Sequence, residues 1–192
     1  MNIVLWIIAA YLIGGIPFGY LIGKMRGVDV RTVGSKNIGA TNVYRTVGKK
    51  WGFLAFFCDF LKGFLPTLLA MHQPLPVWGP TAVGFACVLG HTLTPYMKFK
   101  GGKGVATAFG MMMALITVPV SIAFAVFVVT VWRSHYISLG SILAAAVVAT
   151  LVWFYPAILP LRVLVTLLGV FIVWKHKSNI ERLVKGCENR IY

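Results

Sequence analysis

The sequence predicts an all-α integral membrane protein with about seven transmembrane helices, its N-terminus outside and its C-terminus in the cytoplasm. Three observations lead to this fold class. Apolar residues form several long runs, and charged residues make up only 11% of the 192 residues, whereas a soluble domain has about a quarter. The basic residues also gather in the polar segments between the runs. No internal repeat or low-complexity segment interrupts this pattern, so we expect a single domain over residues 1–192.

The apolar runs set the expected spans. They lie at 2–23, 51–71, 77–97, 104–117, 119–132, 138–155 and 159–174. Several contain glycine or proline, which transmembrane helices tolerate. The first span differs from a signal peptide because no basic residue precedes it, whereas Lys24 and Arg26 follow it. That order is typical of a retained span whose N-terminus lies outside.

The run over 105–132 is either one long helix or two short helices broken near 117–119. Charge favours two helices. With two, every basic residue except Lys62 and Arg162 falls on one side of the membrane, as the positive-inside rule predicts. A single helix would place the basic C-terminal tail outside. Each of the two helices is then short for a bilayer, which usually takes about 20 residues.

The net charge of +14, from 18 basic and 4 acidic residues, has two explanations that can hold together. The positive-inside rule accounts for basic loops, whereas basic motifs rich in glycine also suit anionic substrates or lipids. Nucleic-acid binding is not expected, since no basic helix or aromatic RNA-binding motif stands out. The three cysteines are scattered, and no acidic or histidine cluster has ligand spacing, so neither a disulfide framework, a metal nor a cofactor is indicated.

The first polar segment is GSKNIGATNVYR at 34–45. Ser35, Asn37 and Thr41 offer short hydrogen-bonding side chains, and Arg45 can hold a phosphate or carboxylate with two parallel bonds. The alternative is an ordinary polar loop. The density of small polar residues, and an arginine within one or two helical turns of Thr41, favour a binding site.

The second polar segment is GHTLTPYMKFKGGKGVAT at 90–107. It contains four residues that we expect to bind an anion: Gly101, Gly102, Lys103 and Gly104. Glycines lack a Cβ atom, so the backbone can turn sharply and direct N–H groups at an anion. A helix expected from Val105 adds the positive end of its dipole. The segment is not a P-loop, because GxxxxGK[ST] is absent, and nucleotide hydrolysis is not favoured.

The third polar segment is the tail, KHKSNIERL at 175–183. His176 and Asn179 are three residues apart, so they share a face if the tail is helical. Ile180 and Leu183 make another face apolar. An amphipathic tail on anionic lipid would explain the lysines, but it does not call for the histidine and asparagine. Both functions can hold together.

Polar residues also occur at or inside the spans. Asp59 and Lys62 are three apart in the second span, and a structural ion pair is the simplest account of two intramembrane charges. His91, near the end of the third span, is either a packing residue or a functional one. Ser138 and Ser141 begin the sixth span, where we expect helix capping, although Ser141 could also reach a ligand.

Together the three polar segments resemble the motifs of the PlsY family, the bacterial glycerol-3-phosphate acyltransferases that use acyl phosphate. GSKNIGATNVYR is similar to the first motif, GHTLTPYMKFKGGKGVAT to the second, and HKSNIERLVKGCE at 176–188 to the third. The resemblance covers nearly the whole chain. It departs at Lys36, where many relatives are expected to have glycine. This change is expected to tune the loop without abolishing phosphate binding.

The resemblance implies an enzyme that moves a fatty acyl group from acyl phosphate to the 1-hydroxyl of sn-glycerol 3-phosphate. The products are 1-acylglycerol 3-phosphate (lysophosphatidic acid) and phosphate, in the first acylation of phospholipid synthesis. Its substrates and membrane lipid are the implied partners, in the bacterial cytoplasmic (inner) membrane with the active site on the cytoplasmic face. The resemblance also implies that acyl-CoA and acyl carrier protein are not the donors. The chain agrees with the family in that neither His91 nor His176 begins the HX4D motif of soluble acyltransferases.

The resemblance also implies roles for the polar residues. Arg45 and Lys103 are expected to hold the phosphate of glycerol 3-phosphate, with help from Ser35. The acyl phosphate is expected to be held by the backbone of the glycine-rich segments and by Asn37, Thr41 and Ser141. His176 and Asn179 are expected to orient the attacking hydroxyl.

Two questions stay open at this point. The proton of the hydroxyl can pass to His176 or to a phosphate oxygen of a bound substrate, and we favour orientation and charge stabilisation over a strong protein base. The competing class of protein is a transporter or channel for a phosphorylated solute, which usually places its site at the midplane between repeated halves. A lipid-binding scaffold is a third possibility, with little use for three phosphate-suited segments.

Overall fold

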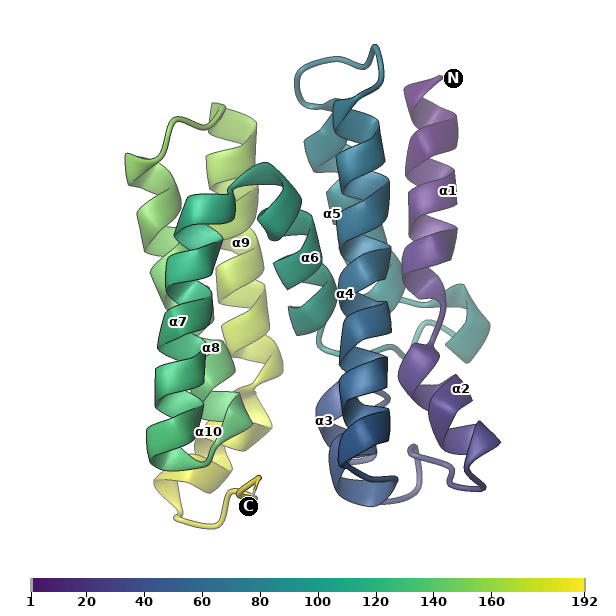
Figure 1. The fold of residues 1–192 in the computed structure, drawn as a ribbon, viewed down its shortest axis with the longest axis vertical. Helices are drawn as coiled ribbons and strands as arrows, with labels where there is room; N and C mark the ends of the chain where they lie inside the picture. Colours follow the sequence, from purple (N-terminus) through teal and green to yellow (C-terminus); the bar gives the residue numbers. More distant parts are fainter. Residues whose placement is uncertain (1, 192) are drawn as a thin grey trace. The chain divides into compact units, whose positions relative to one another are not determined.

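The computed structural model describes residues 2–191, and within that range the chain forms helices and turns with no β-strand. The predicted all-α class is therefore confirmed. The helices form two compact units, one ending at Leu115 and the other beginning at Ile116 (Figure 1). Each unit is described by itself.

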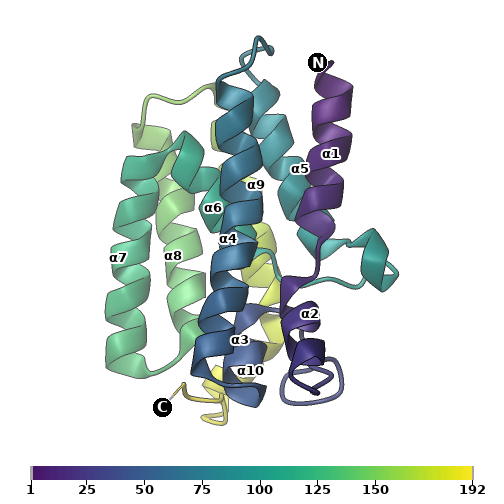
Figure 2. The same cartoon turned by 45° about the vertical axis from the view of Figure 1, so that its right-hand side comes forward.

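The first unit is organised around its longest helix, α4. Its helices are α1 (Ile3–Gly15), α2 (Phe18–Met25), α3 (Ala40–Thr46), α4 (Lys49–Met71), α5 (Gly79–Thr92) and α6 (Val105–Leu115), with a 3₁₀ turn η1 (Pro95–Met97). Helices α3, α5 and α6 pack against α4, and α1 packs against α5. The segment that joins α5 to α6 lies near the middle of α4 in both views (Figures 1 and 2).

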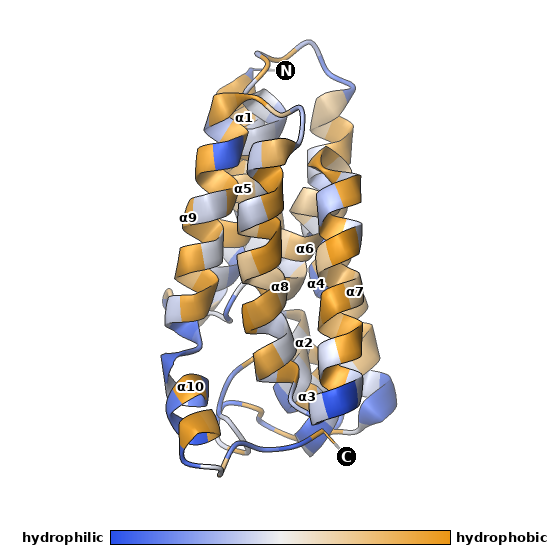
Figure 3. Cartoon of the chain, turned by 90° about the vertical axis from the view of Figure 1, so that its left-hand side faces the viewer, coloured by the Kyte–Doolittle hydropathy of each residue, from blue (hydrophilic) through white to orange (hydrophobic). Residues whose placement is uncertain are grey.

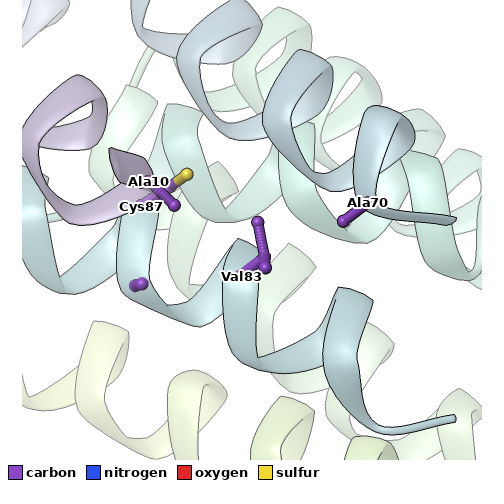
Figure 4. Packing of buried hydrophobic residues seen from close by; sticks show 5 residues of the cluster. Ala10, Ala70, Val83 and Cys87 are labelled. Carbon is purple, nitrogen blue, oxygen red and sulfur yellow. The ribbon is translucent and has the colours of Figure 1, made fainter. Parts of the chain in front are cut away.

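Small residues let the helices of this unit approach closely. A Cβ atom on Gly63 of α4 would overlap the carbonyl of Thr107 in α6, and one on Gly110 of α6 would overlap the carbonyl of Phe60 in α4. Transmembrane helices commonly use such small residues at their contacts. A core of small side chains also joins α1, α4 and α5; Figure 4 shows Ala10, Ala70, Val83 and Cys87 within it.

The first apolar run is interrupted in the structure. Helix α1 ends before Ile16, whose backbone is not helical (φ −55°, ψ 117°), and α2 begins after Pro17. Proline has no N–H to donate and disfavours a helical conformation in the residue before it. At this break the Ile16 carbonyl accepts from the N–H of Phe18 at 3.1 Å and from the Nζ of Lys62 at 2.8 Å.

The second unit contains the remaining helices. They are α7 (Thr117–Ser134), α8 (Ile137–Leu151), a 3₁₀ turn η2 (Val152–Phe154), α9 (Leu159–Lys175) and α10 (Lys177–Val184). Helix α8 packs against both α7 and α9. Helices α7, α8 and α9 are apolar over most of their length, whereas α10 carries many hydrophilic residues (Figure 3). The prediction of two helices over 105–132 is confirmed, with the break at Ile116 (φ −141°, ψ 58°).

Each of the seven expected spans contains a helix, but not all of these helices are long. Four helical stretches are long and apolar enough to cross a membrane, or five if the bent pair α9 and α10 counts as one. The expected span at 77–97 is a helix of only 14 residues, and α6 has 11. Crossing of the membrane by α5 and α6 therefore stays a prediction.

Candidate active site

A buried amide organises the first polar segment. The Oδ1 of Asn42 accepts a hydrogen bond from the N–H of Ser35 at 2.9 Å. Its Nδ2 donates to the carbonyls of Val30 and Val33 at 2.8 and 3.2 Å. Gly34 has φ +59°, and a Cβ atom there would overlap the Asn42 amide. The loop is therefore folded around Asn42, a structural role that the sequence did not reveal because any polar side chain in such a loop could bind a ligand.

The predicted binding residues of this segment lie on and before α3. Asn37 accepts a hydrogen bond from the N–H of Gly39 at 2.8 Å, which shapes the turn that leads into the helix. Arg45 lies one turn after Thr41 in α3, within the predicted one or two helical turns, so the two residues share a face. Ser35 is exposed, whereas Asn37, Thr41 and Arg45 are half-buried.

Lys36 adopts a backbone conformation that favours glycine. Its φ is +57°, in the left-handed region that costs a residue with a side chain roughly 1–2 kcal/mol. This is the position at which the sequence departs from the pattern expected of its relatives. Lysine in place of glycine therefore affects the backbone conformation of the loop, and the polar side chains of the segment are unchanged.

The glycine-rich segment differs from its prediction in one respect. We expected Gly101 and Gly102 to direct their N–H groups at an anion, but these groups donate to the carbonyls of Thr92 and His91, both at 3.1 Å. The last carbonyls of a helix lack partners within it, and the segment turns back to satisfy those of α5. The glycines are required here because a Cβ atom on either would overlap residue His91.

The rest of this segment lies as predicted. Helix α6 begins at Val105, so the positive end of its dipole directly follows Lys103 and Gly104. Lys103 is half-buried and Gly104 is buried with φ +81°. Lys98 and Phe99 also have positive φ, 53° and 60°. They form the turn that returns the chain to α5.

A buried ionic cluster lies beside this segment. Asp59 and Lys62 form an ion pair at 2.6 Å, each with a side chain 2% exposed, so the predicted structural pair is confirmed. The Nδ1 of His91 lies 3.6 Å from Oδ1 of Asp59. The sequence left the role of His91 open, because 32 residues separate it from Asp59 and no local spacing connects them.

His176 occupies the junction between α9 and α10 in the second unit. Its side chain is buried, and Nδ1 lies 2.7 Å from the carbonyl of Ile172. A carbonyl only accepts hydrogen bonds, so Nδ1 carries the proton, and in the neutral ring Nε2 is an acceptor. This tautomer suits a residue that accepts a hydrogen bond from a substrate hydroxyl.

Glu188 links the tail to α8. Its Oε1 accepts hydrogen bonds from Asn179 at 2.7 Å and from Ser138 at 2.9 Å, and its Oε2 accepts one from Arg182 at 2.6 Å. These donors outweigh burial and lower the pKa of Glu188. The sequence showed Glu188 at the end of the third motif but gave it no role.

The serines of α8 do not cap it, contrary to our expectation. The residue before the helix is Tyr136, and no side chain caps the first turn. Ser138 donates to Glu188, and Ser141 donates to the carbonyl of Ile137 at 2.9 Å. Both serines lie within the helix, where their hydroxyls bond to a tertiary partner or to the preceding turn.

Three of the four carboxylates are held in ion pairs. Asp59 pairs with Lys62 and Glu188 with Arg182. A hydrogen bond from the Arg31 side chain lowers the pKa of Asp29 to about 2. Glu181, the fourth, is exposed on α10. A carboxylate with a lowered pKa is a weak proton acceptor at neutral pH, so neither Asp29 nor Glu188 is a strong base.

Comparison with known proteins identifies the chain. The family profile described as "Glycerol-3-phosphate acyltransferase" matches residues 4–186. The chain belongs to the glycerol-3-phosphate acyltransferase family. The glycerol-3-phosphate acyltransferase of Trichlorobacter lovleyi is 49% identical over 96% of this chain and 95% of its own. That of Aquifex aeolicus is 43% identical over 99% and 100%.

Solved structures agree with this assignment. The glycerol 3-phosphate form of PlsY (YgiH), an integral membrane glycerol 3-phosphate acyltransferase, is 41% identical with a TM-score of 0.93, over 98% of this chain and 94% of that one. The lysophosphatidic acid form is 40% identical with a TM-score of 0.89, over the same shares. The predicted PlsY family is thereby confirmed, and with it an integral membrane acyltransferase of phospholipid synthesis.

Proposed function

We propose that this acyltransferase takes its acyl group from acyl phosphate and transfers it to the 1-hydroxyl of sn-glycerol 3-phosphate. The products are lysophosphatidic acid and phosphate. The related PlsY structures in glycerol 3-phosphate and lysophosphatidic acid forms support the acceptor and the product. In this proposal residues 1–192 form a single membrane-embedded acyltransferase domain, with membrane lipid around its helices.

The observation that carries the choice of donor is the state of the histidines. The Nδ1 of His91 lies 3.6 Å from Asp59, which is buried and already paired with Lys62. His176 bonds through Nδ1 to a backbone carbonyl. Asp59 is therefore shared between His91 and Lys62, and the Nδ1 of His176 bonds to a carbonyl where a catalytic triad has a carboxylate. An acyl phosphate is already activated, so its transfer needs orientation of the hydroxyl more than a strong base.

All but one of the phosphate-binding residues in this proposal belong to the first unit, and the exception is Ser141 on α8 of the second unit. Arg45 on α3 and Lys103 before α6 hold the phosphate of glycerol 3-phosphate, with Ser35. The acyl phosphate is held by Asn37, Thr41 and Ser141 together with the backbone of residues 101–104. Because the N–H groups of Gly101 and Gly102 are used within the protein, the contribution of that backbone comes from Lys103, Gly104 and the first turn of α6.

The second unit supplies the residues that orient the hydroxyl. The Nε2 of His176 accepts the hydrogen bond of the 1-hydroxyl in this proposal, and Asn179 fixes its direction. As the hydroxyl oxygen bonds to the acyl carbon and the bond to phosphate breaks, the proton passes to His176 or to the departing phosphate. Positive charge from Arg45 and Lys103 stabilises the phosphates during this step.

The proposed setting is the cytoplasmic membrane of a bacterium. The basic segments lie on the cytoplasmic face, with seven crossings, the N-terminus outside and the C-terminus inside. Single cysteines introduced at Lys36 and Lys177, both exposed, should react with a membrane-impermeant reagent only after the membrane is opened. Labelling of either one in intact cells would contradict this topology.

The activity is tested with purified protein in detergent. We expect phosphate release and lysophosphatidic acid when palmitoyl phosphate and glycerol 3-phosphate are both present. We expect neither with palmitoyl-CoA or palmitoyl-acyl carrier protein as donor. A solute carrier would release no phosphate, and transfer from palmitoyl-CoA alone would refute the proposed donor. In His176→Ala, substantial remaining activity would exclude His176 as an essential base.

A further inference from the structure

His91 lies in direct contact with the glycine-rich segment, although the proposed function gives it no role. Its carbonyl accepts the N–H of Gly102 at 3.1 Å. Its ring faces the same residue: a Cβ atom on Gly102 would overlap Nε2 of His91 and lie 2.9 Å from Cε1. The ring therefore supports the backbone one residue before Lys103.

Buried charges lie beside this ring. The Nδ1 of His91 lies 3.6 Å from Asp59, whose other neighbour is Lys62 at 2.6 Å. Lys62 in turn donates to the carbonyl of Ile16 at the break between α1 and α2. All three side chains are at most 6% exposed. The cluster beside the ring thus connects α5 to α4 and to the break in the first apolar run.

We propose that His91 is a positioning residue for the reaction, which holds Gly102 and thereby places Lys103 against the phosphate of glycerol 3-phosphate. This inference rests on the proposed function. The ring of His91 does not touch the substrate in this mechanism. It acts through the backbone of Gly102, which fixes the position of Lys103. A displacement of a binding group by about 1 Å can reduce catalysis strongly.

The contact predicts that a smaller side chain at residue 91 makes room for a larger side chain at residue 102. Gly102→Ala pushes a methyl group against the imidazole and should raise the KM for glycerol 3-phosphate about tenfold. His91→Asn keeps an amide toward Asp59 and removes Nε2 and Cε1, the two atoms nearest to that methyl group. We expect His91→Asn to raise the same KM with little change in kcat, because binding that is equal in ground and transition states affects KM alone. In this background Gly102→Ala should add less than about a twofold increase.

Gly101 provides the matched control. A Cβ atom on Gly101 would overlap the backbone carbonyl of His91 and approach the carbonyl group of Thr92. No change of side chain at residue 91 can relieve that overlap. Gly101→Ala should therefore carry the same penalty in the wild-type and His91→Asn backgrounds. Relief at residue 102 without relief at residue 101 separates a specific contact from general loosening of the segment.

The measurement is the KM and kcat of each single and double variant, with the melting temperature of each in detergent. If Gly102→Ala alone does not yield folded protein, a folded and active His91→Asn/Gly102→Ala variant would show that the smaller residue 91 relieves the overlap. An equal penalty of Gly102→Ala in the wild-type and His91→Asn backgrounds, in KM or in melting temperature, would overturn this inference. The proposed function would still stand in that case if the wild-type protein transfers the acyl group. A wild-type protein that transfers no acyl group would overturn both.

Discussion

The side chain of Asn179 donates a hydrogen bond to the carboxylate of Glu188 at 2.7 Å. Nine residues separate them, and the chain between them leaves α10 and turns back. The same carboxylate accepts from Ser138 of α8. The amide proposed to orient the substrate is therefore held by a residue that lies outside the helix and makes no proposed contact with substrate.

Glu188→Gln tests this arrangement. The substitution removes the charge that pairs with Arg182 and replaces one acceptor oxygen by a donor, which clashes with one of its donor partners. A buried hydrogen-bond network that loses an acceptor costs about 1–3 kcal/mol, so we expect a lower melting temperature and reduced kcat. Glu181→Gln is the matched control, because Glu181 is an exposed glutamate of the same tail, on α10, and it should change neither quantity. Unchanged stability in Glu188→Gln would show that the network contributes nothing.

The same group predicts how stability depends on pH. The pKa of Glu188 is lowered in the folded protein by its hydrogen bonds. A lowered pKa means that the folded state favours the ionised form, so this stabilisation is complete above the unfolded pKa, about 4.3 for glutamate. It is lost as the pH falls through the lower, folded pKa. The melting temperature should therefore drop in acid by more in the wild type than in Glu188→Gln.

Lys36 offers a direct test of backbone strain. Its φ of +57° is accessible to glycine at little cost, whereas alanine retains the clash of its Cβ atom. Lys36→Gly and Lys36→Ala both remove the charge, and only the first relieves the conformation. We expect Lys36→Gly to be the more stable of the two by about 1 kcal/mol, measured by thermal unfolding. Equal melting temperatures would contradict a strained loop.

The buried pair of Asp59 and Lys62 should matter far more than the exposed pair of Asp29 and Arg31. Asp59→Asn leaves the charge of Lys62 buried without its counter-ion, and the loss of one partner of such a pair costs about 3–5 kcal/mol. We expect a large fall in melting temperature, much of it recovered in Asp59→Asn/Lys62→Met. Asp29→Asn breaks an exposed pair and should have little effect. A mild effect of Asp59→Asn would mean that Lys62 loses its charge readily.

Arg45 and Lys103 should contribute to substrate binding more than to folding. Replacing either by glutamine removes a charge-assisted hydrogen bond to phosphate, worth about 1.5–3 kcal/mol, and should raise the KM for glycerol 3-phosphate roughly 10- to 100-fold. Lys100→Gln is the control for Lys103→Gln, since Lys100 is exposed in the same segment. Unaltered kinetics in both Arg45→Gln and Lys103→Gln would remove them from the site.

The sequence by itself determined the helical class, the position of each long helix and the three polar segments. Apolar runs and basic flanks are local properties, and a lipid environment leaves helices as the simplest way to satisfy the backbone. The pairing of Asp59 with Lys62 was equally accessible, because residues three apart meet on a helix. The start of α6 and the shared face of Thr41 and Arg45 followed from the same short spacings.

Only the tertiary structure decided what these segments contact. Several contacts join residues that no helical period relates. They are the bond from Gly102 to His91, the approach of His91 to Asp59, and the bonds from Asn179 and Ser138 to Glu188. The tertiary structure also gave the N–H groups of Gly101 and Gly102 to the end of α5, where the sequence suggested an anion. A glycine shows that space is short, but only the packed chain shows which neighbour occupies it.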